Sequence, residues 1–237
     1  MQKYGEWRSP DNRLLATLPV KEYERLLPHL QSFALAQREV IQAKGDAVEY
    51  VYFPNDAIII LLSTVDEDSM IEVGLVGREG MVGVTVLFGG KSPPSQAVVL
   101  AAGGSMRLKS DVLRREFKRG GGLQDVLLPY AQAVLTQSAQ SASCHRYHSV
   151  RERLSRFLLM IHDRAAADEF RVTHELMSRM LGLRRATVTE AAHDLQEQGL
   201  IKYRRGSIRV TNRQGLESAA CNCYRIIQEG FDSLTYA

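Results

Sequence analysis

The stretch from Val172 to Val210 constrains the fold of this chain more than any other, because helix, turn and strand signals follow one another there without a gap. Thr173 can cap a first short helix with its hydroxyl group, and Gly182 ends that helix and turns the chain. A second helix is predicted from about Arg185, with apolar residues at intervals of three and four and a stop at Gly199. Its apolar face consists of Val188, Ala191, Ala192 and Leu195.

Two short strands are predicted after the second helix, Ile201–Tyr203 and Ser207–Val210, and Gly206 permits positive φ in the turn between them. Helix, glycine turn, helix and basic hairpin together form a winged helix-turn-helix. Arginines and short polar side chains on such a unit can reach base edges and phosphates. The predicted DNA-binding residues are Thr173, Arg184, Arg185, Thr187, Thr189, Glu190, His193, Lys202, Arg204, Arg205 and Ser207.

The charge distribution supports this interpretation. Residues 172–213 contain eight Lys or Arg and four acids, whereas the whole chain of 237 residues has a net charge of only +3. The basic excess therefore coincides with the segment whose pattern indicates DNA binding. The alternative is a helical hairpin with a solvated charged face.

The preceding part of the chain has a different character. Residues 13–35 predict two short helices that are interrupted by Pro19 and end near Pro28. Residues 39–106 hold short Val/Ile-rich segments separated by Gly, Asp, Asn or Pro. The latter pattern, which includes GMVGVTVLFGG, predicts a compact antiparallel sandwich or roll. No apolar run approaches the ~20 residues of a membrane span, and the first residues lack a signal peptide. A cytoplasmic protein without membrane contact is expected.

A long helix is predicted from Leu123, after a short helix at residues 110–117 and three consecutive glycines. Spacings of four and three define a seam on it that is apolar at first and polar later, ending at Cys144. One helix cannot bury such a seam alone, so we expect a second copy of the chain to cover it; packing against the chain's own β roll is the alternative. The expected dimerisation residues are Leu123, Leu127, Tyr130, Val134, Gln137 and Ser141.

The cysteines and histidines predict no metal site and no cofactor. Cys144 stands alone, and Cys221 and Cys223 lie two apart on a predicted packing helix from Gly215 to Leu234. This spacing fits neither an ordinary disulfide nor a four-ligand metal site, so all three are interpreted as free thiols, with a redox role for Cys144 as the alternative. Three histidines also lack a carboxylate or thiolate partner at ligand spacing: His145, His148 and His162.

The segments MSRMLGLRRATVTEAAHDLQEQGLI and YRRGSIRV resemble the helix-turn-helix and wing of the cyclic-AMP receptor protein and fumarate-nitrate regulator (Crp/Fnr) family of bacterial transcription regulators. KGDAVEYVYFPNDAIIILL and GREGMVGVTVLFGG resemble its β roll more loosely. The resemblance implies an α+β fold in three parts. These are a cyclic-nucleotide-binding-like antiparallel β roll, or jelly roll (1–120), a long dimerisation helix (121–147) and a winged helix-turn-helix DNA-binding domain (148–237).

By this resemblance, Arg185 reads bases near the start of the recognition helix, with Thr187 and Thr189 beside it. The implied partners are a palindromic double-stranded DNA operator, a second copy of the chain, and RNA polymerase. Ala186 and Glu190 depart from the family pattern, which has an acid and a second arginine at these positions. A carboxylate can accept a hydrogen bond from cytosine, so the operator is expected to differ from the best-known family site.

The resemblance also places an effector site at Gly83, Val84, Ser95 and Gln96 in the β roll and at Ser138 on the long helix. Val84 and the Ser95–Gln96 pair stand where cyclic-nucleotide-binding members have a ribose-binding glutamate and a phosphate-binding arginine–serine pair. Cyclic AMP bound in the usual way is therefore not expected, and any effector is an unidentified small molecule. No cysteine precedes Cys144, so the amino-terminal iron–sulfur cluster of some members is not expected, and neither is haem.

Two other functions fit the sequence less well. A β-roll enzyme would need metal ligands or a nucleophile with its base, and residues 39–106 contain no histidine and no cysteine. We therefore do not expect an enzyme. The alternative to a DNA-binding regulator is a ligand-binding regulatory module that acts on a protein partner, with the wing as the contact surface.

Overall fold

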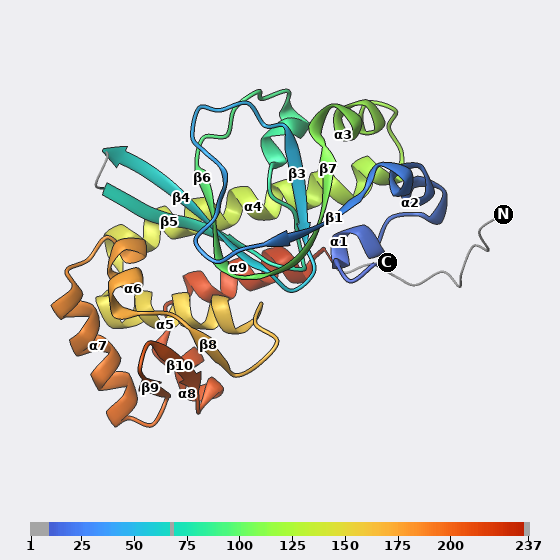
Figure 1. Ribbon diagram of the computed structural model, residues 1–237. Helices are drawn as coiled ribbons and strands as arrows, with labels where there is room; N and C mark the ends of the chain where they lie inside the picture. Colours follow the sequence, from blue (N-terminus) through green and yellow to red (C-terminus); the bar gives the residue numbers. More distant parts are fainter. Residues whose placement is uncertain (1–9, 67–68, 235–237) are drawn as a thin grey trace.

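The amino-terminal part of the protein consists of two antiparallel sheets and the helices around them. The computed structural model describes residues 10–66 and 69–234. The sheets have the strand orders β1-β7-β3 and β2-β6-β4-β5 and enclose an apolar core, which confirms the predicted β roll (Figure 1). The strands are β1 Gln31–Leu35, β2 Val40–Gln42, β3 Tyr50–Pro54, β4 Ile58–Asp66, β5 Ser69–Val76, β6 Gln96–Ala101 and β7 Gly103–Lys109.

Short helices cover one end of this roll. They are α1 Arg13–Ala16, α2 Val20–Leu26, the 3₁₀ helices η1 Leu27–His29 and η2 Val84–Phe88, and α3 Ser110–Phe117. The helices end near Pro28, as expected, and the following residues form strand β1, which pairs with β7. One detail differs from the sequence-based expectation, because the Val-rich stretch VTVLF forms η2 instead of a strand. Gly83 and Gly89, which flank η2, are left-handed and turn the chain too tightly for an extended strand.

Helix α4 (Gly122–Tyr147) runs along the roll and buries the predicted seam against it. The Tyr130 hydroxyl donates to Met81 O at 2.7 Å. The Gln137 side-chain amide accepts a hydrogen bond from Leu75 N and donates one to Leu75 O. The expectation that a second copy covers this seam is therefore wrong, because strand β5 and the following loop of the same chain occupy it. The residues concerned are Leu123, Leu127, Tyr130, Val134, Gln137 and Ser141, all buried within one chain.

The carboxyl-terminal part begins with α5 (Val150–His162) and contains the winged helix-turn-helix. The remaining elements are β8 Glu169–Arg171, α6 His174–Leu181, α7 Arg185–Glu197, β9 Ile201–Arg204, β10 Ser207–Val210, α8 Arg213–Ala219 and α9 Cys223–Asp232. Strand β8 extends the predicted hairpin to a three-stranded sheet, β8-β10-β9. The single packing helix expected from Gly215 to Leu234 is wrong, because an extended residue, Ala220, divides it into α8 and α9. No helix in the described part of the chain is long and apolar enough to cross a membrane.

A buried ion pair joins the two parts of the molecule. Arg156 of α5 and Glu72 of β5 lie 2.7 Å apart, and both side chains are fully buried. Ser141 of α4 donates to the same carboxylate and accepts from Arg156, so three elements meet in one polar network. Helix α6 also packs against β5, and the helix-turn-helix is therefore held directly on the roll.

Candidate nucleic-acid interface

Local sequence signals build the helix-turn-helix as expected. The Thr173 hydroxyl accepts a hydrogen bond from Leu176 N at 3.1 Å, and Gly182 ends α6 in the left-handed region at φ 60°. Four side chains on the inner face of α7 are buried, which leaves its opposite face free: Val188, Ala191, Ala192 and Leu195. In Figure 1, α7 lies at the edge of the molecule, with α6 between it and the strands of the roll.

The predicted DNA-binding residues lie at the start of α6, on α7 and its N-terminal cap, and on the wing hairpin, and are called the α7–wing surface below. Nine of the eleven are exposed, and Thr187 and Ser207 are half-buried. Within residues 10–66 and 69–234, no carboxylate neutralises Arg184, Arg185, Arg204, Arg205 or Lys202. Arg209 differs, because it bonds Glu169 at 2.6 Å within the wing sheet. The surface therefore presents several uncompensated cations beside short polar groups.

The wing turn is tighter than predicted. Arg204 pairs with Ser207, so only Arg205 and Gly206 form the turn, and both have positive φ (49° and 81°). A two-residue turn of this kind matches the twist of the flanking strands. It holds the Arg204 and Arg205 side chains at the tip of the hairpin.

His174 is a member of this surface that the sequence analysis missed. Its ring stacks on Tyr203 of the wing, with centroids 4.0 Å apart, and its Nδ1 lies 3.0 Å from the Thr189 hydroxyl. Burial, and secondarily the nearby Arg185 guanidinium, lower the pKa of His174 and favour its neutral form. Because the contact depends on the folded wing, no local sequence signal could have indicated it.

The predicted effector residues lie on three elements or at their ends. Gly83 and Val84 begin η2, Ser95 and Gln96 lie at the start of β6, and Ser138 is half-buried on α4. Gln96 alone of the five lines a described cavity, a groove of about 890 Å³ that also contacts Thr173, Arg179 and the wing turn. The other four line none of the described cavities.

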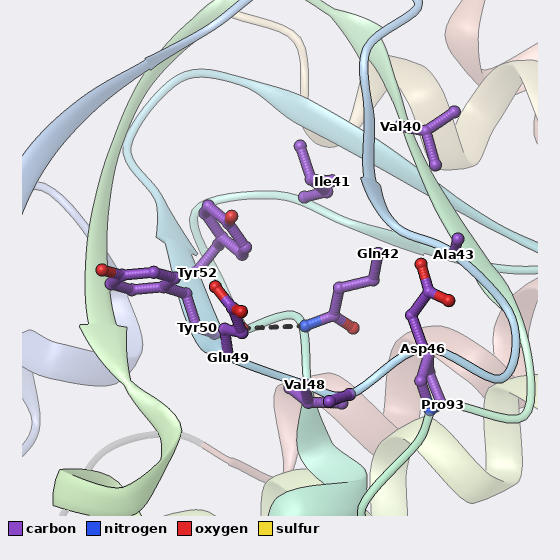
Figure 2. A pocket seen from close by; sticks show the side chains of 11 residues that line it. Val40, Ile41, Gln42, Ala43, Asp46, Val48, Glu49, Tyr50, Tyr52 and Pro93 are labelled. Atoms are coloured by element: carbon purple, nitrogen blue, oxygen red, sulfur yellow. Dashed lines mark hydrogen bonds between the residues drawn. The ribbon is translucent and has the colours of Figure 1, made fainter.

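The roll has a different hollow of about 420 Å³ between β2, β3 and Pro93 (Figure 2). The Gln42 amide donates to Tyr50 O at 2.9 Å, and the Asp46 and Glu49 carboxylates lie at the same hollow (Figure 2). Described residues lining this hollow include no Lys, Arg or His. It is therefore poorly suited to an anionic ligand.

The structure brings the three cysteines together, so Cys144 does not stand alone as the sequence suggested. The sulfurs of Cys144 and Cys221 lie 3.4 Å apart, and Cys223 Sγ lies 3.6 Å from His148 Nδ1. The statement that His148 lacks thiolate partners is therefore wrong. Cys144 lies with His148 at the end of α4, and Cys221 and Cys223 lie at the break between α8 and α9. The sequence analysis placed this break inside one helix.

Comparison with known proteins agrees with this geometry. Residues 152–219 match the model of the Crp-like helix-turn-helix domain. The chain resembles the Crp/Fnr regulators. Its fold is that of a Crp/Fnr-type DNA-binding transcription regulator, with a cyclic-nucleotide-binding-like roll and a winged helix-turn-helix. A search of curated protein sequences finds no significant match.

Three solved Crp/Fnr-like structures illustrate the common fold. FixK2 from Bradyrhizobium japonicum is 19% identical, covers 81% of this chain and 98% of its own, and superposes with a TM-score of 0.70. A Crp/Fnr-family regulator from Eubacterium rectale is 15% identical, with coverage of 87% and 96% and a TM-score of 0.69. The c-di-GMP responsive regulator CLP from Xanthomonas campestris is 19% identical, with coverage of 81% and 99% and a TM-score of 0.64.

Proposed function

We propose that the protein is a sequence-specific transcription regulator that binds a palindromic DNA operator as a homodimer. The observation that carries this proposal is the exposed α7–wing surface, where arginines with no carboxylate partner among the described residues lie beside threonines. Such a surface provides both phosphate contacts and base contacts. We propose that this regulator acts on RNA polymerase in the cytoplasm and has no catalytic activity. We also propose that the chain is divided into a sensor domain (1–120), a dimerisation helix (121–147) and a DNA-binding domain (148–237).

Within this surface we assign base reading to Arg185, with Thr187, Thr189 and Glu190 beside it on α7. Arg185 is exposed at the first turn of the helix, where a bidentate contact with guanine is geometrically possible. Phosphate contacts are assigned to the remaining members of the predicted set: Thr173, Arg184, His193, Lys202, Arg204, Arg205 and Ser207. The Thr189 hydroxyl donates to Arg185 O at 2.9 Å in the free protein, so it is expected to exchange partners on DNA.

The dimer contact is assigned to the exposed face of α4, since the opposite face is buried against the roll. Leu128 and Leu135 are 47% and 56% exposed. Spacings of four and three join these leucines to a glutamine and to two alanines, whose small side chains allow close approach of a second helix. This stripe consists of Leu128, Gln132, Leu135, Ala139 and Ala142.

We propose that the roll binds an effector, and that this effector is not cyclic AMP bound in the usual way. The hollow in Figure 2 carries Asp46 and Glu49, whose carboxylates oppose a phosphate. A neutral or cationic small molecule fits this chemistry better. The same argument disfavours c-di-GMP, the effector of CLP, in this hollow.

Selection of bound duplexes from a random library, followed by fluorescence anisotropy, tests the proposal. We expect a palindrome to be recovered and its affinity to fall steeply with salt. Arg185→Ala should lower discrimination between the selected and a random duplex by about 1–3 kcal/mol, because one base contact is lost. Arg204→Ala should instead weaken binding to both duplexes and reduce the salt slope by about one.

Arg225→Ala is the matched control, since Arg225 is an exposed arginine on α9 outside the surface. Equal weakening of both duplexes by Arg185→Ala would contradict base reading by that residue. No binding to any duplex at low salt would favour the regulatory module that acts on a protein partner.

A further inference from the structure

Four side chains that could hold a metal ion converge beside the end of α4. Cys144 lies in the last turn of α4 and His148 directly follows that helix, so a spacing of four residues places them on one side. Cys221 and Cys223 flank the break between α8 and α9. One donor atom from each of these four residues lies within 4.8 Å of all the others.

The distances fit a tetrahedral zinc site. With Zn–S bonds of about 2.3 Å, tetrahedral geometry separates two sulfurs by roughly 3.8 Å, and a sulfur from a nitrogen by slightly less. The Cys144–Cys221 and Cys223–His148 separations, 3.4 Å and 3.6 Å, are close to these values. A disulfide would satisfy only two of the four groups and would leave the rest of the cluster unexplained.

The electrostatic surroundings favour a negatively charged cluster. Arg153 and Arg156 are buried nearby, and both interact electrostatically with Cys144. Among the described residues one carboxylate, Glu72, forms an ion pair with Arg156, and none does so with Arg153. The Nε atoms of both arginines are buried and have no hydrogen-bond partner in the part of the chain that the structure describes. Three thiolates with one Zn²⁺ carry a charge of −1, which would offset the surplus cation.

The three thiols are also buried and close together, as the ligands of a structural metal site are. All three cysteines are buried and contact one another in a cluster separate from the main core. The Cys144 and Cys221 sulfurs lie within hydrogen-bond distance of each other, 3.4 Å apart. A closed set of three cysteines and one histidine, with no position left for substrate, is one of the common structural zinc sets.

We propose that Cys144, His148, Cys221 and Cys223 form a structural zinc site. The site joins two segments separated by 77 residues, the α4–α5 junction and the α8–α9 junction. Because these ligands cannot converge in the unfolded chain, zinc binding contributes to folding. The α4–α5 junction connects the helix on the roll to the helix-turn-helix, so the metal would fix the orientation of α7. The inference does not depend on the proposed DNA-binding function.

Metal content tests this site without any DNA-binding assay. The full-length protein without a histidine tag is purified with a reductant, incubated with zinc, desalted, and analysed for metal by plasma mass spectrometry. We expect about one tightly bound zinc per chain. Cys223→Ser and His148→Ala should each lower occupancy at least tenfold, because one ligand is lost. His29→Ala removes an exposed histidine outside the cluster and should leave occupancy unchanged.

Cobalt replacement in the wild-type protein provides a second readout that needs no variant. Co²⁺ in the site should produce thiolate-to-metal charge-transfer bands and the intense visible bands of tetrahedral cobalt, and zinc should displace it. Reduced wild-type protein that retains neither metal would overturn the proposal. So would zinc that stays bound when Cys223→Ser and His148→Ala are combined in a folded variant.

Discussion

Arg156 is the residue on which the connection between the two parts of the molecule depends most. Its guanidinium is fully buried and contacts Glu72 at 2.7 Å, the Ser141 hydroxyl at 3.2 Å and the Met160 sulfur at 3.1 Å. Burial alone would lower the pKa of Arg156, but the Glu72 carboxylate more than offsets this effect and raises it. The Arg156 guanidinium therefore keeps its charge, and Glu72 and Arg156 each depend on the other as a buried partner.

Replacement of one partner should therefore be costly. Arg156→Met keeps an unbranched apolar stem but leaves the Glu72 carboxylate buried without its cation, and we expect a loss of about 3–5 kcal/mol in the free energy of unfolding. Urea denaturation measures this loss. Arg225→Met changes an exposed pair on α9 and should cost less than about 0.5 kcal/mol. A similar small loss for both variants would show that Glu72 finds another partner or is protonated.

Single residues also show what the sequence could and could not predict. Thr173 and Gly182 act through neighbours three or four positions away, and the structure places both as expected. Arg156 and the cysteines act through residues more than 60 positions away, and they looked ordinary in the sequence. Composition and spacing encode local contacts, whereas the meeting of α5 with β5 depends on the completed fold.

At the scale of elements, α5 begins with a complete capping box. The Ser149 hydroxyl accepts from Glu152 N, and the Glu152 carboxylate accepts from Ser149 N at 2.8 Å. These bonds satisfy two otherwise unpaired donors at the start of the helix that carries Arg156. The hydrogen bond from the Ser149 side chain, followed by that from its backbone, lowers the pKa of Glu152.

This lowered pKa predicts a pH dependence. A carboxyl whose pKa is lower in the folded state stabilises the protein above its ordinary value of about 4.5, and the stabilisation is lost as the pH falls through the lower, folded-state pKa. Glu152→Gln should reduce stability by about 0.5 kcal/mol at pH 7, the size expected for an exposed carboxylate at a helix start. The two unfolding curves should converge as the pH decreases toward 3.

Glu24→Gln is the control for this measurement, because Glu24 is exposed on α2 and should give no pH-dependent difference. A difference between wild type and Glu152→Gln that persists unchanged at low pH would mean that the charge of Glu152 does not stabilise the helix start.

Elements that depend on distant partners were the ones the sequence did not predict. β1 and β8 are short and pair with strands far along the chain, β7 and β10, so their own residues carry little strand signal. Helix α4 was predicted with its seam, but the sequence could not decide which surface covers it. The roll covers it, because the Tyr130 and Gln137 side chains find backbone partners there.

At the scale of the whole molecule, the exposed stripe on α4 predicts the oligomeric state. Leu135→Glu places a charge at the centre of the proposed dimer contact, and we expect the protein to shift from dimer to monomer in analytical ultracentrifugation. Affinity for the palindrome should fall at least tenfold, since two half-sites are no longer linked. Leu27→Glu alters another exposed leucine, on η1, and should leave the dimer intact. A monomeric wild-type protein would contradict the assignment.

The position of α9 has a consequence for how this protein is made. Phe231 packs its ring 6.3 Å from that of Tyr130 on α4, and the Arg164 guanidinium lies over it. Residues 223–232 are therefore synthesised after all the elements against which they pack. During synthesis, part of the apolar side of α4 stays open to water and to chaperones until this helix arrives. The roll and its long helix can fold first, but the apolar side of α4 is completely buried only when α9 packs against it.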